Sequence, residues 1–155
     1  MKKNAKRLLL QEALEHLDQA TTHLEFSQIR TEKIIQQETW TPVELERLES
    51  FSSRFARLSD LLTQKIMRLI DELELIAGGT LLDRIQRAEK RDWVDSASDL
   101  VQIRELRNLI AHEYVVDSMA EIYQAVTVLT PKLLAITPKV RKHAEQLLKQ
   151  YSQTS

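Results

Sequence analysis

The chain of 155 residues contains no cysteine, only two glycines and only three prolines. Without cysteine, disulfides and thiolate chemistry are excluded, which fits a reducing cytoplasm. So few glycines and prolines leave little material for the turns of a strand-based fold. No apolar run approaches the roughly 18 residues of a membrane-crossing helix, and the leucines at 8–10 end too soon for a signal peptide. The sequence therefore predicts an all-α cytoplasmic protein without a membrane partner.

The formal net charge of −1 argues against a protein that coats nucleic acid, because contacts to many phosphates need a basic surface. The end of the chain differs, since basic residues outnumber acidic residues after Pro131. The basic residues there are Lys132, Lys139, Arg141, Lys142 and Lys149, and the acidic residue is Glu145. We interpret this run as a solvated helix face, with contact to RNA or to a partner as the alternative.

Two long amphipathic helices are predicted in the first half of the chain. Leucines at 10, 14, 17 and 24 place one helix over residues 3–37, and apolar residues every three or four positions place another over residues 45–76. The sequence Thr-Pro-Val-Glu at 41–44 has the pattern of a capping box. The glycine pair at 78–79 is expected to end the second helix.

Three further helices are predicted in the second half. Thr80 and Ser96, each followed three positions later by an aspartate, are expected N-caps. A break at 117–118 separates the fourth helix from the fifth. The Thr-Pro pairs at 130–131 and 137–138 each look like a cap followed by a proline in the first helical position. They predict that the last helix is kinked or split.

Together these elements predict one domain, residues 1–155, of a size that can bury a sizeable core. Its fold class is all-α, an up-and-down bundle of about five to six helices. We expect the core of the domain to span residues 5–135, with residues 136–155 as a C-terminal helical extension.

The stretch from Arg107 to Tyr114, Arg-Asn-Leu-Ile-Ala-His-Glu-Tyr, holds the residues with the most evident chemistry. Arg107 falls inside the apolar stripe of the fourth helix, where a guanidinium needs an anionic partner or a cleft. His112 lies roughly 140° further round a straight helix. The two side chains converge only if the helix ends near Ala111, or if a second copy of the chain brings its own pair alongside.

This run, with Asn108 directly after the arginine and Tyr114 two residues after His112, resembles the signature of the HEPN superfamily. Over about residues 5–135 the chain resembles the HepT-like toxins, each paired with a minimal nucleotidyltransferase antitoxin. The resemblance implies a HEPN-like bundle and a homodimer whose Arg–His motifs share one cleft. It implies a metal-independent endoribonuclease toxin of a type II toxin–antitoxin system. It also implies that the antitoxin attaches AMP to Tyr114 and so blocks the cleft.

The residue types fit cleavage of RNA without a metal. That reaction needs a base for the 2′-hydroxyl proton, an acid for the leaving 5′ oxygen and a cation for the charge on the phosphate. His112 suits the proton roles and Arg107 the charge role, and a dimer supplies a second histidine. Asn108 is expected to bond the phosphate or to fix the imidazole, and Tyr114 to orient the substrate. We predict a 2′,3′-cyclic phosphate product.

No cofactor and no metal site are expected. The chain has no glycine-rich loop to cradle nucleotide phosphates and no cluster of side chains at metal-ligand spacing. His16 and His23 share a helix face but lie about 10 Å apart, which is too far to hold one ion. We interpret both as surface histidines.

Two other interpretations stay open. A non-catalytic HEPN module would bind a nucleotidyltransferase or nucleic acid and cleave nothing. In a scaffold without an active cleft, Arg107 would pair with an acid such as Glu113 or Asp99, and His112 would only cap the helix. All three interpretations share the same bundle, and only the enzyme requires the His112 imidazole.

Overall fold

The structure is a computed structural model that describes residues 2–76, 78–112 and 119–153. These residues form helices and no strand, which confirms the all-α prediction. The elements in chain order are α1 (Lys2–Thr31), η1 (Ile34–Gln36), α2 (Pro42–Asp60), η2 (Leu61–Ile66), α3 (Met67–Leu73), α4 (Leu81–Lys90), α5 (Ala97–Ala111) and α6 (Met119–Gln153). η1 is a short 3₁₀ turn, whereas η2 is a π-helical turn.

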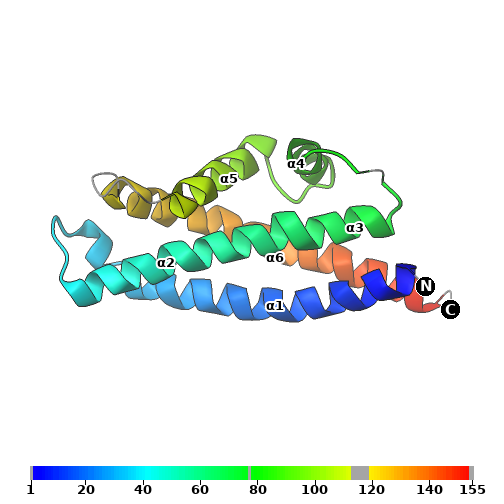
Figure 1. Cartoon of the computed structure of the whole chain (residues 1–155), viewed down its shortest axis with the longest axis horizontal. Helices are drawn as coiled ribbons and strands as arrows, with labels where there is room; N and C mark the ends of the chain where they lie inside the picture. The colour runs from blue at the N-terminus through cyan, green and yellow to red at the C-terminus, as the bar shows by residue number, and fades with distance from the viewer. Residues whose placement is uncertain (1, 77, 113–118, 154–155) are drawn as a thin grey trace.

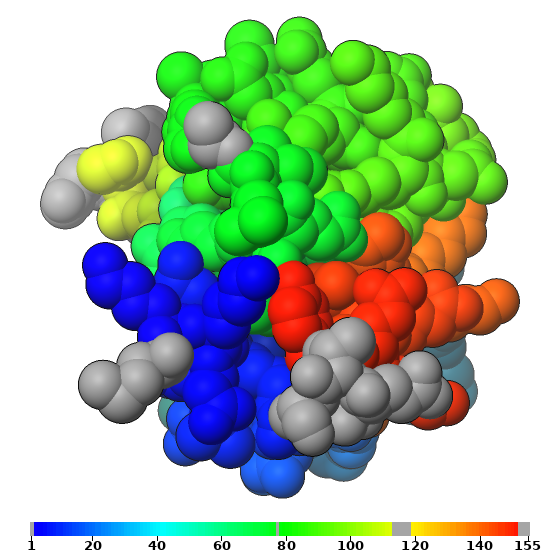
Figure 2. Space-filling view, turned by 90° about the vertical axis from the view of Figure 1, so that its right-hand side faces the viewer, coloured from blue at the N-terminus to red at the C-terminus, as the bar shows by residue number. Residues whose placement is uncertain are grey.

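The long helices run alternately up and down one bundle, as predicted (Figure 1). α1 runs one way, and the continuous rod of α2, η2 and α3 runs back beside it. α5 then runs in the direction of α1, and α6 runs in the direction of the rod. The short α4 packs against α5 and η2. The start of α1 and the end of α6 lie side by side at one end of the bundle (Figure 2), where Lys3 Nζ lies 5.9 Å from the centre of the Tyr151 ring.

α1 buries the leucine stripe that the sequence predicts, but it ends earlier than expected. Leu10, Leu17 and Leu24 are completely buried. The helix stops at Thr31 rather than near Gln37. The predicted boundary is therefore wrong, although the predicted core face of the helix is confirmed.

A second, smaller core explains the early end of α1. Ile34 and Ile35 are buried with Leu48 and Tyr123. Trp40 packs against this cluster and donates a hydrogen bond from Nε1 to the carbonyl of Ile34 at 2.6 Å. The turn after α1 brings the two isoleucines into this cluster, which a straight continuation of the helix would not do.

The α2–η2–α3 rod begins with the predicted capping box. Thr41 Oγ1 accepts a hydrogen bond from the Glu44 N–H at 3.2 Å, and the Glu44 carboxylate accepts one from the Thr41 N–H at 2.9 Å. Midway, the helix widens into the π turn η2, which directly follows Asp60. There Arg84 of α4 donates to the carbonyl of Thr63 at 3.0 Å, so a side chain from another helix binds the backbone of this irregular turn.

The expectation that Gly78 and Gly79 end the second helix is wrong. The chain reverses instead at Leu75, whose φ is 61°, and neither glycine has a positive φ. The Ile76 N–H donates to the carbonyl of Asp71 at 2.9 Å, which closes α3 as a Schellman motif. A leucine therefore occupies the left-handed position that glycine usually takes.

The predicted starts of α4 and α5 are confirmed. Thr80 Oγ1 accepts a hydrogen bond from the Asp83 N–H at 3.1 Å, and the Asp83 carboxylate accepts one from the Thr80 N–H at 3.0 Å. Ser96 is the N-cap of α5, and its Oγ accepts a hydrogen bond from the Ser98 N–H at 3.2 Å. The spacing of the capping residues in the sequence is therefore enough to predict where these two helices begin.

α6 is one helix of 35 residues, so of the two predicted alternatives, a kink or a split at its prolines, the split is wrong. Pro131 and Pro138 both lie on the exposed face of this helix. On the opposite face, Leu133 and Val140 are completely buried. Core packing therefore holds the helix together where two backbone N–H groups are missing.

The threonines that precede these prolines are not caps. The buried hydroxyls of Thr130 and Thr137 donate to the carbonyls of Val126 and Leu133, at 2.7 and 3.2 Å, one turn earlier in the same helix. This back-bonding satisfies a buried hydroxyl without ending the helix. The break predicted at residues 117–118 lies outside the described residues.

The last part of α6 packs in the main hydrophobic core with α1 and α3. Val140, Ala144 and Leu147 are buried there. Among the helices that the structure describes, none combines the length and the apolar character that crossing a membrane requires.

Candidate functional site

Arg107 lies on α5 with its guanidinium against a carboxylate of α2. Its Nε and Nη2 donate to Oδ1 and Oδ2 of Asp60 at 2.7 and 2.8 Å, which is a two-pronged pair. Arg104, one turn earlier on α5, donates from Nη1 to Oδ1 of the same carboxylate at 3.0 Å. Asp60 thus holds two arginines of α5 on one side of the bundle.

The acid that pairs with Arg107 is not one that the sequence suggested. Asp99 instead accepts a hydrogen bond from Lys132 at 3.0 Å, and Glu113 lies outside the described residues. Asp60 is 47 residues from Arg107 in the chain, and it was missed because no local pattern links the two. The general expectation that Arg107 needs an anionic partner is nevertheless met.

This ion pair sits at the protein surface rather than in the core. The Arg107 side chain is 28% exposed and the Asp60 side chain 35% exposed. The hydrogen bond to Asp60 raises the pKa of Arg107 and so favours the charged form of the guanidinium. Nε and Nη2 are engaged, while Nη1 of Arg107 has no hydrogen-bond partner among the described residues.

A hollow of about 320 Å³ opens beside this pair, between α2 and α5. Glu49, Ser53 and Ala56 form the α2 wall, and Arg107, Ile110 and Ala111 form the α5 wall. The α2 wall therefore offers a carboxylate and a hydroxyl, the α5 wall offers a cation, and each wall also carries apolar side chains. A surface groove of this kind can place an anionic group against Arg107 while keeping part of it away from water.

His112 marks the end of α5. The helix ends at Ala111, and the His112 N–H donates to the carbonyls of Asn108 and Leu109 at 3.2 and 3.1 Å. This end point meets one of the two conditions under which Arg107 and His112 can converge. Both Asn108 and His112 are exposed, whereas Tyr114, the fourth predicted site residue, lies outside the described residues.

The histidines of α1 lie apart from this groove. His16 and His23 are both exposed, and with Arg57 they line a separate hollow. Within residues 2–76, 78–112 and 119–153, no three histidine, aspartate or glutamate side chains are grouped so that they could hold a metal ion. The side chains that line the α2–α5 groove offer guanidinium, hydroxyl and carboxylate groups, and His112, one residue beyond Ala111, is not among them.

Several cations of the basic C-terminal run have acidic neighbours. Lys132 Nζ lies 3.0 Å from Asp99, and Arg141 lies 3.1 Å from Asp18 and 3.0 Å from Glu145. These pairs lie at the surface and fit the interpretation of the run as a solvated helix face.

Known proteins do not place this chain in a family. No family model, no curated protein and no solved structure matches it. An all-α bundle hosts many activities, so the fold alone does not choose among them. The functional interpretation therefore rests on the residues of the α2–α5 groove and on the run from Arg107 to Tyr114.

Proposed function

We propose that this chain is a metal-independent endoribonuclease, the toxin of a type II toxin–antitoxin pair in the cytoplasm. The observation that carries the proposal is the run Arg107, Asn108 and His112 at the end of α5, beside an open groove in which Asp60 orients the arginine. The same run carries the resemblance to HepT-like toxins. Imidazole and guanidinium together supply the proton transfers and the charge that RNA cleavage without a metal requires.

In the proposed reaction, the RNA 2′-hydroxyl loses its proton to one His112 and attacks the adjacent phosphorus. The bond from phosphorus to the 5′ oxygen breaks, and a second imidazolium returns a proton to that oxygen. The products are a 2′,3′-cyclic phosphate and a 5′-hydroxyl end. Arg107 stabilises the charge on the phosphate oxygens through Nη1, while Asp60 keeps the guanidinium in place through Nε and Nη2.

Two histidines are needed for this scheme, and a homodimer provides them from two copies of the run. The exposed end of α5 supports a contact there, because Leu109 is 57% exposed directly beside Asn108. The arrangement would form one composite cleft between the protomers. Asn108, which is exposed, would bond the phosphate or fix the tautomer of the imidazole.

The proposed partner is a nucleotidyltransferase antitoxin that attaches AMP to Tyr114 and blocks the cleft. The support is the position of this tyrosine two residues after His112 in the run. A phenol there would place a bulky anionic nucleotide next to the RNA site. Modification by the cognate partner should disappear in Tyr114→Phe, and undiminished modification of that variant would remove this part of the proposal.

The test in cells compares growth on expression of the wild-type chain, Arg107→Ala and His112→Ala, with mapping of the RNA ends from the same cultures. Arg68→Ala and His16→Ala are matched controls, because both side chains are exposed and lie outside the groove. We expect growth arrest and cyclic phosphate ends with the wild type and both controls only. Cleaved RNA with 3′-hydroxyl ends would contradict the mechanism.

A non-catalytic HEPN module is the second proposal, and one observation favours it. Two guanidinium nitrogens of Arg107 are already matched by Asp60, as in a purely structural ion pair. Such a module would bind a nucleotidyltransferase or RNA equally well with alanine at position 112. Harmless expression of a folded wild-type chain that still binds its partner would support this proposal over the enzyme.

A further inference from the structure

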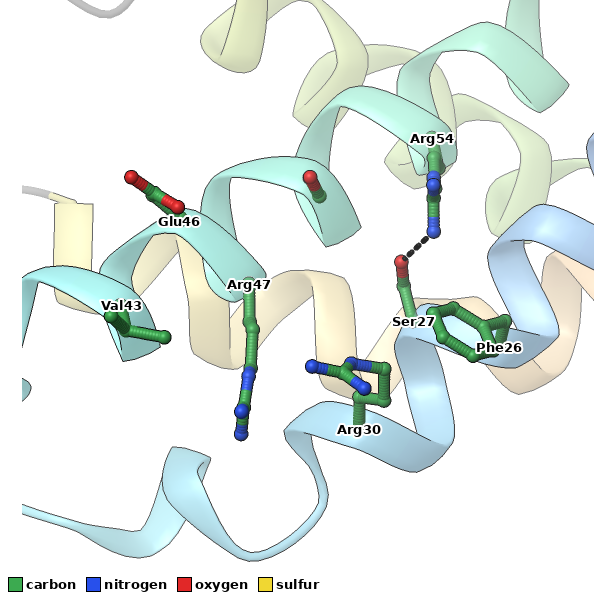
Figure 3. A pocket seen from close by; sticks show the side chains of 8 residues that line it. Phe26, Ser27, Arg30, Val43, Glu46, Arg47 and Arg54 are labelled. Carbon is green, nitrogen blue, oxygen red and sulfur yellow. Dashed lines mark hydrogen bonds between the residues drawn. The ribbon is translucent and has the colours of Figure 1, made fainter.

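A second hollow, separate from the α2–α5 groove, lies between α1 and α2 (Figure 3). Its volume is about 260 Å³, somewhat below the roughly 300 Å³ at which pockets for drug-sized ligands begin. Arg30 comes from α1, and Arg47 and Arg54 come from α2. A site of this size suits one phosphate with part of its nucleotide rather than a whole cofactor.

The three arginines are not neutralised within the pocket. Glu46 is the one acidic side chain among its lining residues, and in Figure 3 its carboxylate points away from the guanidinium groups. In the part of the chain that the structure describes, no carboxylate lies within ion-pair distance of Arg30, Arg47 or Arg54. Arg47 Nε is also shielded from solvent without a hydrogen-bond partner among these residues. The pocket therefore gathers three guanidinium groups that no carboxylate of the described residues neutralises.

Arg54 is held in place before any ligand binds. Its Nη1 donates to Ser27 Oγ at 2.7 Å and to the carbonyl of His23 at 3.3 Å. Ser27 itself is only 4% exposed, so it forms a rigid base for the arginine. A guanidinium that is already oriented loses less freedom when it binds a phosphate.

An exposed aromatic ring adjoins the arginines. Phe26 is 53% exposed, and its ring centre lies 5.2 Å from Cζ of Arg30 and 5.9 Å from Cζ of Arg54. Arginines beside an accessible aromatic face form the combination that binds single-stranded nucleic acid, with phosphates on the cations and a base on the ring.

The pocket and the α2–α5 groove share one stretch of α2. Arg47 and Arg54 reach the pocket on one face of the helix, whereas Ser53 and Ala56 line the groove on a neighbouring face, roughly a third of a turn away. The two sites are thus separated by less than the helix diameter of about 10–12 Å. One extended strand crossing the exposed residue Ser50 could occupy both.

We infer that the α1–α2 pocket is a subsite for single-stranded RNA, in which Arg30, Arg47 and Arg54 bind a phosphodiester and Phe26 stacks against a neighbouring base. The inference rests on the proposed function in taking this RNA to be the strand that is cut at Arg107 and His112. The pocket would hold a part of that strand away from the cleaved bond. The pocket would determine which RNA lengths and which base sequences bind well.

The test measures binding of a fluorescent single-stranded RNA of 12 nucleotides to the full chain carrying His112→Ala, which prevents cleavage. The Arg30→Gln/Arg47→Gln double variant leaves the structural Arg54 untouched. We expect the slope of log affinity against log salt to fall by about 0.7 for each lost phosphate contact, or about 1.4 in all. Arg57→Gln/Arg68→Gln is the matched control, because it removes the same charge from exposed positions outside the pocket.

Phe26→Leu separates stacking from charge, because leucine keeps an apolar side chain and lacks the π-face. We expect roughly 5- to 150-fold weaker binding with little change of the salt slope. Equal losses in the pocket variant and the control variant would overturn the inference, since general charge would then explain binding. Unchanged binding in both pocket variants, with circular dichroism showing folded protein, would overturn it as well.

The two proposals can fail separately. If the pocket variants bind RNA normally while the wild-type chain still produces cyclic phosphate ends, the subsite is wrong and the ribonuclease stands. If the pocket variants lose binding but neither Arg107→Ala nor His112→Ala changes the effect on cells, the subsite stands and the ribonuclease is wrong.

Discussion

Two arginine–carboxylate clusters lie on the same rod, one on each side of the π turn η2. Asp60 precedes the turn and holds Arg104 and Arg107 of α5, with 35% of its side chain exposed. Asp71 follows the turn, and its side chain is only 7% exposed. The chemistry of the two clusters is the same, but their solvent exposure differs. A buried ion pair holds the fold together, whereas a partly exposed pair contributes little to stability and leaves its arginine accessible to a ligand.

The Asp71 cluster fastens α4 to α3. Arg87 and Arg91 donate to its two oxygens at 2.7 and 2.8 Å, and Arg84 Nε lies 3.8 Å away. Arg91 also reaches Glu74 at 3.0 Å. Burial lowers the pKa of Arg84, and the nearby Asp71 opposes that shift. No ligand is needed to explain this cluster, because each of its three arginines lies within ion-pair distance of Asp71.

α6 is tied to the same cluster. His143 of α6 contacts the carboxylate of Glu74, and its ring packs edge-on against Trp93 with 5.2 Å between the ring centres. Cζ of Arg91 also lies 4.8 Å from the Trp93 ring centre. α3 and α4 thus meet at the buried carboxylate of Asp71, and α6 joins them through Glu74.

The largest effect should come from Asp71→Asn. Loss of this buried charge leaves Arg84 and Arg87 without their anion and Arg91 with Glu74 alone, and we expect a loss of about 3–5 kcal/mol in the free energy of unfolding. Urea unfolding measures it. Glu72→Gln is the control, because its partners Lys6 and Arg68 are 3.6 and 3.9 Å away at the surface, and it should cost at most about 1 kcal/mol. Similar losses in both variants would erase the distinction between the buried and the exposed clusters.

Asp60→Asn should separate stability from activity. Because the pair is partly exposed, we expect a loss of about 1 kcal/mol or less in the free energy of unfolding. RNA cleavage should fall by roughly 10- to 100-fold, since Arg107 loses the partner that orients it. Single-turnover cleavage and urea unfolding of the same preparation measure the two effects. Normal cleavage by this variant would show that Asp60 does not position the arginine.

Arg107→Lys should sharpen the same point. Lysine keeps the charge but cannot make the two-pronged contact, so we expect cleavage well below the wild-type level with folding preserved. The raised pKa of Arg107 means that the pair's contribution to stability is complete below the ordinary pKa of arginine and is lost only as the pH rises through the raised pKa. The stability difference between wild type and Arg107→Gln should therefore not fall as the pH rises from 7 to 10. A steady decline of that stability difference between pH 7 and pH 10 would contradict the raised pKa of Arg107.

The smallest effect should come from the exposed capping box of α2. Hydrogen bonds from the Thr41 backbone and the Gln37 side chain lower the pKa of Glu44 below its ordinary value of 4.5. Its contribution to stability is therefore present above pH 4.5 and is lost as the pH falls through the lowered pKa. NMR titration of Glu44 tests this directly. In Gln37→Ala, which removes the second of these hydrogen bonds, the shift should shrink, and an unchanged pKa in that variant would show that the Gln37 side chain does not contribute.

Local signals predicted most of the fold. Capping boxes at Thr41 and Thr80 and leucines at helical spacing depend on residues within one or two turns, so they can be found in the sequence. The errors come from tertiary packing. Leu75 tolerates a left-handed conformation at the end of α3, and core contacts keep α6 whole through Pro131 and Pro138.

The site could be predicted only in part. The need of Arg107 for an anion follows from its position on an apolar stripe, but Asp60 is 47 residues away and has no sequence feature that marks it. The α1–α2 pocket was missed for the same reason, because Arg30 and Arg47 come together only when α1 and α2 pack. Tyr114 stays a prediction from the motif.

The most direct test of the central claim uses purified protein, a labelled RNA and excess EDTA. We predict that the wild-type chain cleaves the RNA and leaves 2′,3′-cyclic phosphate ends, whereas folded His112→Ala and Arg107→Ala leave it intact. Cleavage that persists in His112→Ala, or that stops in EDTA, would show that the run at the end of α5 is not a metal-independent ribonuclease site.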